Sequence, residues 1–277
     1  MTVPADSAKD QVRTDTTGFV NLRDNSRWAG GSHMYDGGDQ LVTGWHFHDV
    51  HEIEYACRGM VEVKTEAGHY LLPPHQAAWI PAGLHHQTTL NAGVQTLAVL
   101  FEPGLVPMAG DRVRIIAVAP LLREMMLYSA RWPISRTESG VEADSFFQTL
   151  GYVVADALDD EKPLHLPVSS DPVVTAAADF TRARLDYVTV SDVTRAVGVS
   201  ERTLRRIFNA SLGMSWRSYL LRARVLRSMA LLAQPDRSVL EVSIAVGFDD
   251  VGAFARSFAR HCGETPSAYK RRISRGP

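Results

Sequence analysis

Residues 189–208 read TVSDVTRAVGVSERTLRRIF, and this stretch decides the fold of the C-terminal part of the chain. Thr189 and Asp192 are spaced as in a capping box, the side-chain arrangement that begins a helix. Gly198 follows about two helical turns later, where a glycine can take the left-handed conformation that ends one helix and opens a tight turn. Ser200 then caps a second helix. The stretch predicts a helix-turn-helix whose second helix faces outward, as binding in a DNA major groove requires.

A second copy of the pattern begins 49 positions later, where residues 238–258 read SVLEVSIAVGFDDVGAFARSF. Ser238 and Glu241 repeat the capping pair, and Gly247 repeats the turn glycine. Between the two copies, the sequence from 215 to about 233 predicts one long joining helix. The C-terminal hundred residues are therefore expected to form an all-α unit with tandem helix-turn-helix motifs.

The charges are divided unevenly along the chain. Residues 171–277 hold 17 Lys and Arg against 10 Asp and Glu, whereas residues 1–170 hold 12 against 21. Sixteen of the 17 C-terminal cations are arginine, which grips phosphate and guanine bidentately. A basic half beside an acidic half indicates a polyanionic partner for the C-terminal half alone.

Composition excludes several classes of protein. Cys57 and Cys262 are the only cysteines and fall in different predicted domains, which excludes a disulfide framework and a cysteine-type zinc site. The first thirty residues lack an apolar run, and no stretch reaches membrane-spanning length. The sequence predicts a cytoplasmic protein without a membrane partner.

The predicted secondary structure changes from strands to helices along the N-terminal half. From about 27 to 102, short alternating segments such as 61–65 are separated by glycine and proline, which predicts a small barrel or sandwich. From about 112 to 160 the apolar period is helical and includes Ile115 and Ile116. We expect an α+β chain of two domains. Its parts are a disordered N-terminus (1–18), a β-barrel (19–110), a helical segment (111–162), an extended linker (163–172) and the helical unit (173–277).

The C-terminal unit resembles the AraC/XylS-type transcription regulators over roughly residues 170–273. The resemblance rests on AVGVS at 196–200, LGMS at 212–215, IAVGF at 244–248 and GETPSAYKR at 263–271. It implies that the two outward helices enter successive major grooves about 34 Å apart.

By position, the resemblance implies two sets of base-facing residues. They are Arg202, Thr203, Arg205 and Arg206 in the first motif, and Val251, Gly252, Ala253 and Arg256 in the second. An arginine bidentate to guanine contributes about 1–3 kcal/mol of discrimination, and contact with phosphate alone is the alternative for these arginines. The second set is less polar than is usual in the family and offers mainly apolar or backbone contacts.

Histidines cluster between His46 and His86. His46 and His48 share one face of a strand, Glu52 keeps their parity, and His86 arrives from a distant strand. Three imidazoles and a carboxylate suit a divalent transition metal such as Zn, Ni, Fe or Mn. The spacing is similar to the cupin metal motif, His-x-His-x3-Glu-x6-Gly followed by Pro-x-Gly-x2-His. An organic effector in a metal-free barrel is the alternative, since regulators of this type commonly lose the metal.

Together these features predict a sequence-specific transcription regulator. A cupin-like domain senses a small molecule or metal, the helices at 111–162 form a homodimer, and the tandem motif binds promoter DNA. RNA polymerase is a further partner if the protein is an activator. The helices could instead only cover the barrel. The competing class is a metal-dependent cupin oxygenase or isomerase with a DNA-binding tail, although residues 1–170 supply no nucleophile or acid/base pair beyond the metal site.

Overall fold

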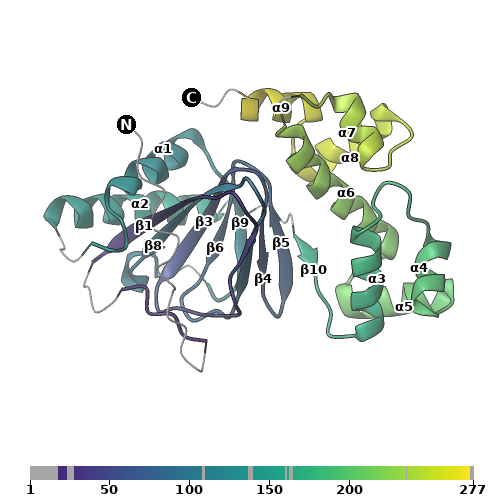
Figure 1. Ribbon diagram of the computed structural model, residues 1–277, viewed down its shortest axis with the longest axis horizontal. Coiled ribbons are helices and arrows are strands. Elements are labelled where there is room, and N and C mark those ends of the chain that lie inside the picture. Colours follow the sequence, from purple (N-terminus) through teal and green to yellow (C-terminus); the bar gives the residue numbers. More distant parts are fainter. Residues whose placement is uncertain are drawn as a thin grey trace.

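The computed structural model describes residues 18–23, 28–107, 110–136, 140–159, 161, 165–234 and 236–274. A β-rich domain lies beside a helical domain (Figure 1). The two-domain α+β fold predicted from the sequence is confirmed. The predicted disordered N-terminus lies outside the described residues, except for Gly18. Among the residues described, no helix is both long enough and apolar enough to cross a membrane.

Two five-stranded antiparallel sheets build the N-terminal domain. The first has the order β1 (Gly30–Asp36), β8 (Gln95–Phe101), β3 (His51–Arg58), β6 (Gln76–Ile80) and β9 (Arg114–Ala117). The second has the order β10 (Leu166–Pro167), β5 (Gly68–Leu72), β4 (Val61–Lys64), β7 (Gln87–Leu90) and β2 (Leu41–Val42). Apolar residues from both sheets, including Ala56, Val63 and Leu72, meet in one core between them.

Strand β3 separates the two sides of the first sheet. Because successive side chains of a strand point to opposite faces, Ala56 faces the core between the sheets, and Glu52 and Glu54 share its face. Ile53 and Tyr55 face the other way and pack beneath helices. Those helices are α1 (Pro120–Tyr128) and α2 (Val141–Asp159), with the short 3-10 helices η1 (Pro103–Leu105) and η2 (Ser129–Arg131) beside them.

The predicted helical segment is wrong at its start, because residues 114–117 form strand β9 rather than helix. Ile115 joins the core between the sheets, whereas Ile116 joins the core beneath the helices. A strand buried on both faces has adjacent apolar residues, and such a short run cannot be distinguished from a helix by periodicity.

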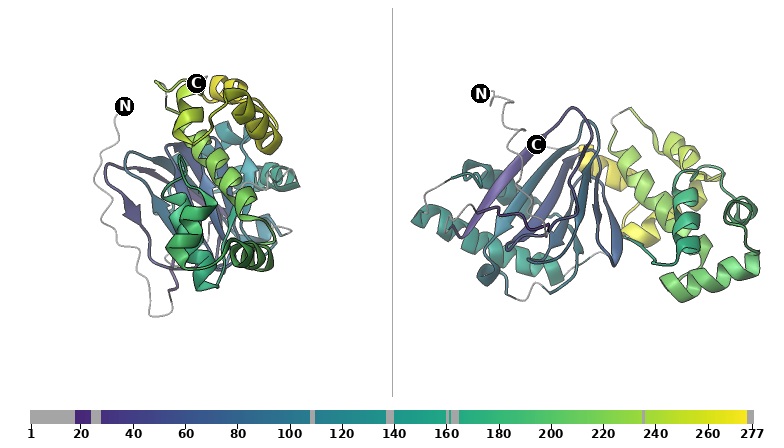
Figure 2. Two further views of the ribbon diagram at one scale, coloured as in Figure 1. Left: turned by 90° about the vertical axis from the view of Figure 1, so that its right-hand side faces the viewer. Right: turned by 60° about the horizontal axis from the view of Figure 1, so that its bottom comes forward.

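The predicted linker is also more ordered than expected. Leu166 and Pro167 form β10, which pairs with β5 opposite His69 and Gly68. The Leu166 side chain is fully buried in the core of the helical domain, so this short strand belongs to both domains. The views in Figure 2 place the helical domain against the β5 side of the barrel, where the Tyr269 hydroxyl donates to the carbonyl of Pro74 at 3.4 Å.

The helical domain is made of α3 (Pro172–Arg182), α4 (Val190–Val197), α5 (Glu201–Leu212), α6 (Trp216–Leu232), α7 (Val239–Ala245), α8 (Val251–Cys262) and α9 (Pro266–Ser274). Both predicted capping boxes are present, at Thr189 with Asp192 and at Ser238 with Glu241. Gly247 has a φ of 83°, and a Cβ there would lie 2.3 Å from the carbonyl oxygen of Asp186. Only glycine fits this turn.

Candidate DNA interface and metal centre

Helix α5 presents an arginine face to solvent. Ser200 caps its N-terminus by accepting from the Thr203 N–H at 3.1 Å. The apolar stripe that includes Leu204 and Phe208 is buried against the rest of the domain. The opposite face carries Arg202, Arg205 and Arg206, which are all exposed. Within the described residues these three arginines have neither an ion pair nor a hydrogen bond, so their cations are available to an external anion or base.

Thr203 differs from the arginines beside it. Its side chain is half-buried, and its hydroxyl lies 3.0 Å from the hydroxyl of Ser200. This contact belongs to the cap that begins α5. The hydroxyl keeps some hydrogen-bonding capacity toward DNA, but its orientation is already fixed by the cap.

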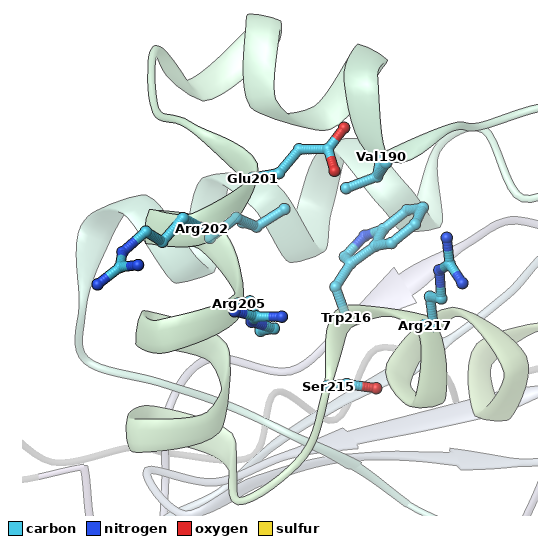
Figure 3. A pocket seen from close by; sticks show the side chains of 8 residues that line it. Val190, Glu201, Arg202, Arg205, Ser215, Trp216 and Arg217 are labelled. Atoms are coloured by element: carbon cyan, nitrogen blue, oxygen red, sulfur yellow. The ribbon is translucent and has the colours of Figure 1, made fainter.

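A groove of about 530 Å³ runs between α5 and the start of α6 (Figure 3). Its walls come from the two helices and from the start of α4. The lining residues are Val190, Glu201, Arg202, Leu204, Arg205, Ser215, Trp216 and Arg217. Two of the predicted base-facing arginines therefore also border a concave surface.

Helix α8 offers a different surface. Asp250 caps it by accepting from the Ala253 N–H at 2.7 Å. Val251 is 42% exposed, whereas Gly252 and Ala253 are half-buried. A Cβ on Gly252 would lie 3.3 Å from a guanidinium nitrogen of Arg256, so the Arg256 side chain extends back over the start of the helix. Arg256 is the single exposed cation among the four predicted residues of this motif.

Three of the four predicted metal ligands, the histidines, lie together in the N-terminal domain, and Glu52 contacts two of them. One ring nitrogen from each of His46, His48 and His86 lies within 4.8 Å of the others. The backbones of His46 and His86 exchange two hydrogen bonds of 2.9 Å. The Glu52 Oε2 atom lies 2.9 Å from His48 Nε2 and 3.7 Å from His86 Nε2.

The local backbone fixes the orientation of all three imidazoles. The Nδ1 atoms of His46, His48 and His86 lie 2.8–2.9 Å from the carbonyl oxygens of Gly44, Val50 and Leu84. A carbonyl oxygen can only accept, so each Nδ1 carries the proton and donates it. This arrangement directs the Nε2 atoms toward the cluster, as in histidines that bind metals.

The protonation states within the cluster differ. Burial lowers the pKa of His86 to about 4, and it also lowers the pKa of His46. Burial acts in the same direction on His48, but the hydrogen bond to Glu52 and the charge of Glu52 raise its pKa overall. Burial raises the pKa of Glu52, yet the hydrogen bond and charge of His48 bring it down to about 2. His86 and His46 are therefore the rings that lose their second proton more readily, whereas the contact with Glu52 favours a proton on His48 Nε2.

Two family comparisons cover most of the chain. The AraC-like ligand binding domain matches residues 31–151, and a helix-turn-helix domain matches residues 193–272.

The chain belongs to the AraC family of transcription regulators.

Relatives of this AraC-family regulator include the HTH-type transcriptional regulator NimR of Escherichia coli K12, which is 26% identical over 244 residues and 87% of each chain. The transcriptional activator NphR of a Rhodococcus species is 38% identical over 88 residues, which cover 32% of this chain and 26% of NphR. A crystal structure of an AraC-type regulator from Chromobacterium violaceum is 28% identical, with a TM-score of 0.37, and covers 39% of this chain and 97% of its own. The sequence-based prediction of a transcription regulator is confirmed.

Two nearby histidines of the AraC-family regulator lie outside the cluster. The His51 Nδ1 accepts from the Ala82 N–H at 3.0 Å, and its ring lies 4.9 Å from that of Trp79. Burial lowers the pKa of His51 to about 4. The His85 ring lies 4.5 Å from the ring of Phe47. Substitutions of His51 and His85 can therefore serve as controls for substitutions of the three clustered histidines.

Sequence reasoning missed two residues beside these sites. Arg217, in the first turn of α6, lines the groove next to α5. Its position two residues after the helix cap Ser215 could have been recognised in the sequence. Glu54 is buried on the inner face of β3, and its Oε1 atom has no partner among the described residues. Burial, and then the charge of Glu52, raise the pKa of Glu54 well above its usual range.

Proposed function

We propose that this regulator couples a divalent transition metal, held by His46, His48, Glu52 and His86, to promoter binding through α5 and α8. The observation that carries the metal proposal is the convergence of three imidazoles whose Nδ1 atoms are all committed to backbone carbonyls. Three nitrogen ligands and one carboxylate leave one or two coordination positions for water or a small effector, and Zn, Ni, Fe and Mn all accept such a set. His46 is only half-buried, which leaves an entry path.

A metal-free barrel that binds an organic effector is the second candidate. One observation favours it: His48 and Glu52 already satisfy each other at 2.9 Å without an ion. A metal would have to displace the proton that His48 holds on Nε2. The two candidates therefore differ in whether the free energy of ion binding exceeds the cost of breaking the buried His48–Glu52 pair.

The deciding experiment is elemental analysis of the full chain purified without chelator, combined with promoter binding before and after chelation. We expect about one equivalent of metal and a change in DNA affinity that is restored on adding the ion back. A metal-free protein whose DNA affinity does not respond to added ions would favour the organic effector instead.

A homodimer is proposed through α1 and α2. Their outward surfaces carry large apolar residues that are at least half exposed, and a soluble monomer rarely gathers several of these on one segment. These residues are Leu121, Tyr128, Val141 and Tyr152. Activation through RNA polymerase is proposed by analogy with relatives that are named activators.

The two half-sites of the promoter are expected to differ in importance. Scrambling the base pairs read by α5 should weaken binding more than scrambling those read by α8. Three of the four predicted base-facing residues of α5 are exposed arginines without a partner among the described residues, whereas Arg256 is the single exposed cation among the four predicted residues of α8. Binding to a scanned set of promoter variants measures both losses. Equal losses at the two half-sites would contradict the asymmetry.

The buried neutral histidines should make the metal-free sensor domain less stable in acid. The folded pKa values of His51 and His86 are both held near 4 by burial, whereas an unfolded histidine titrates near 6.5. Between these values the two histidines bind more protons in the unfolded chain, so they lower the free energy of unfolding as pH falls from 6.5 to 4, whereas the raised pKa of Glu54 acts in the opposite direction. The slope is up to about 1.4 kcal/mol per pH unit for each histidine.

Chemical denaturation of the full chain across this pH range measures the slope. His51→Gln removes one of these titrating groups, so the free energy of unfolding of the variant should fall less steeply with acid than that of the unchanged protein, by up to about 1.4 kcal/mol per pH unit. A pH dependence that is the same in His51→Gln as in the unchanged protein would rule out a buried neutral His51.

A further inference from the structure

The groove between α5 and α6 gathers three arginines that form no ion pair with any of the described residues. Arg202, Arg205 and Arg217 line it, and in the described part of the chain none of the three has an acidic partner. Glu201 is the single carboxylate among the lining residues. Figure 3 shows Glu201 at the Val190 end, on the far side of the Trp216 ring from Ser215. The part of the groove nearest Ser215 is therefore its most positive region.

The base of this groove is rigid. Trp216 is 6% exposed, and its indole N–H donates to the hydroxyl of Thr181 at 2.9 Å. Arg205 from α5 and Arg217 from α6 flank this ring (Figure 3). A groove with a fixed aromatic base and exposed guanidinium groups on its walls suits a small, strongly anionic group better than a bulky apolar one.

The start of α6 adds donors to the same place. Ser215 caps the helix by accepting from the Ser218 N–H at 3.1 Å, and its carbonyl accepts from Tyr219. The N–H groups of Trp216 and Arg217 precede these bonds and have no partner within the helix, as at any helix N-terminus. They lie beside the arginines, so the charge of the side chains and the polarity of the helix act together.

We propose that this groove binds one backbone phosphate of the promoter, on the strand that borders the major groove occupied by α5, with Arg217 as its principal cation. The inference rests on the proposed binding of promoter DNA by α5. The groove is continuous with the surface of α5 that is proposed to contact DNA, because Arg202 and Arg205 belong to both. A guanidinium fits phosphate bidentately, and a phosphate contact fixes the register of a recognition helix without reading sequence.

The test compares Arg217→Ala with the unchanged protein on its promoter and on an unrelated duplex. Losing one phosphate contact should reduce the slope of log affinity against log salt by about 0.9. A fourfold rise in salt should then cost the unchanged protein about 3.5-fold more affinity than the variant. Because the contact carries no sequence information, the loss should be equal on both duplexes, and the ranking of promoter variants should be preserved.

The phosphate itself is located by replacing single phosphates of the promoter with neutral methylphosphonates. At one position, the methylphosphonate should weaken binding by the unchanged protein but should not weaken binding by Arg217→Ala any further. This result is expected when the phosphate and Arg217 are the two partners of one interaction. Arg58→Ala, an exposed arginine of the sensor domain, is the charge-matched control and should keep the full salt slope. Arg217 is exposed, so its removal should leave thermal unfolding unchanged.

An unchanged salt slope in Arg217→Ala, or additive losses at every methylphosphonate position, would overturn the phosphate site. A loss confined to one base pair would also overturn it, because Arg217 would then be reading sequence. These outcomes are separable from failure of the proposed function. If α5 does not bind the promoter, scrambling its half-site has no effect, whereas a failed Arg217 contact leaves that half-site requirement intact.

Discussion

Replacing both His46 and His48 with alanine is expected to abolish stabilisation of the protein by metal. An ion that binds only the folded state adds about 2.7 kcal/mol to the free energy of unfolding when its free concentration is a hundredfold above the dissociation constant. The double variant keeps one imidazole and Glu52, which are too few ligands for a four-coordinate site. Denaturation of the full chain with and without added ion measures the difference.

The matched control is the double variant His51→Ala, His85→Ala. It removes the same number of imidazoles from the same region, but neither ring belongs to the cluster that includes His86. This control should keep the whole stabilisation by metal. If the unchanged protein gains no stability from any of Zn, Ni, Fe or Mn, the four residues are not a metal site, and the barrel remains an organic-effector pocket.

The parts of the fold that were predictable depend on local chemistry. A capping pair such as Thr189 with Asp192 uses only residues within one turn, and a turn glycine such as Gly198 is required by its own backbone angle of 69°. His48 does contact Glu52, but not through strand parity as predicted, because β3 begins only at His51 and residues 48–50 lie outside any strand. The capping and turn signals need no knowledge of distant contacts, so the tandem motif could be predicted from the sequence, whereas the approach of His86 to His46 depends on the pairing of two distant segments.

The parts that were missed depend on partners far away in the sequence. Residues 114–117 form a strand because both faces of β9 are covered, by the opposite sheet and by helices. Leu166 is ordered because β5 offers an edge to its backbone and the helical domain buries its side chain. No local pattern carries this information. The carbonyls that orient the three imidazoles are local, but their directions follow from loop backbone angles that residue identity does not fix.

Removing either Arg205 or Arg206 is expected to weaken promoter binding by about 1–3 kcal/mol, which is roughly 5- to 150-fold, and to relax the preference at one base pair. Both side chains are exposed on the outward face of α5 and have no partner in the described part of the chain, so their truncation should weaken DNA contacts and leave folding unchanged. Affinities of Arg205→Ala and Arg206→Ala for promoters with each base pair varied in turn provide the measurement.

Arg205→Lys separates base reading from contact with phosphate. Lysine keeps the charge but cannot form the planar bidentate pair with guanine, so it should lose base preference while nearly retaining the salt slope. A lysine variant that keeps its base preference would assign Arg205 to the backbone, together with Arg217. If both alanine variants keep their affinity and their preference at every base pair, α5 is not the helix that reads the promoter. The three arginines on its outer face would then be a solvated surface.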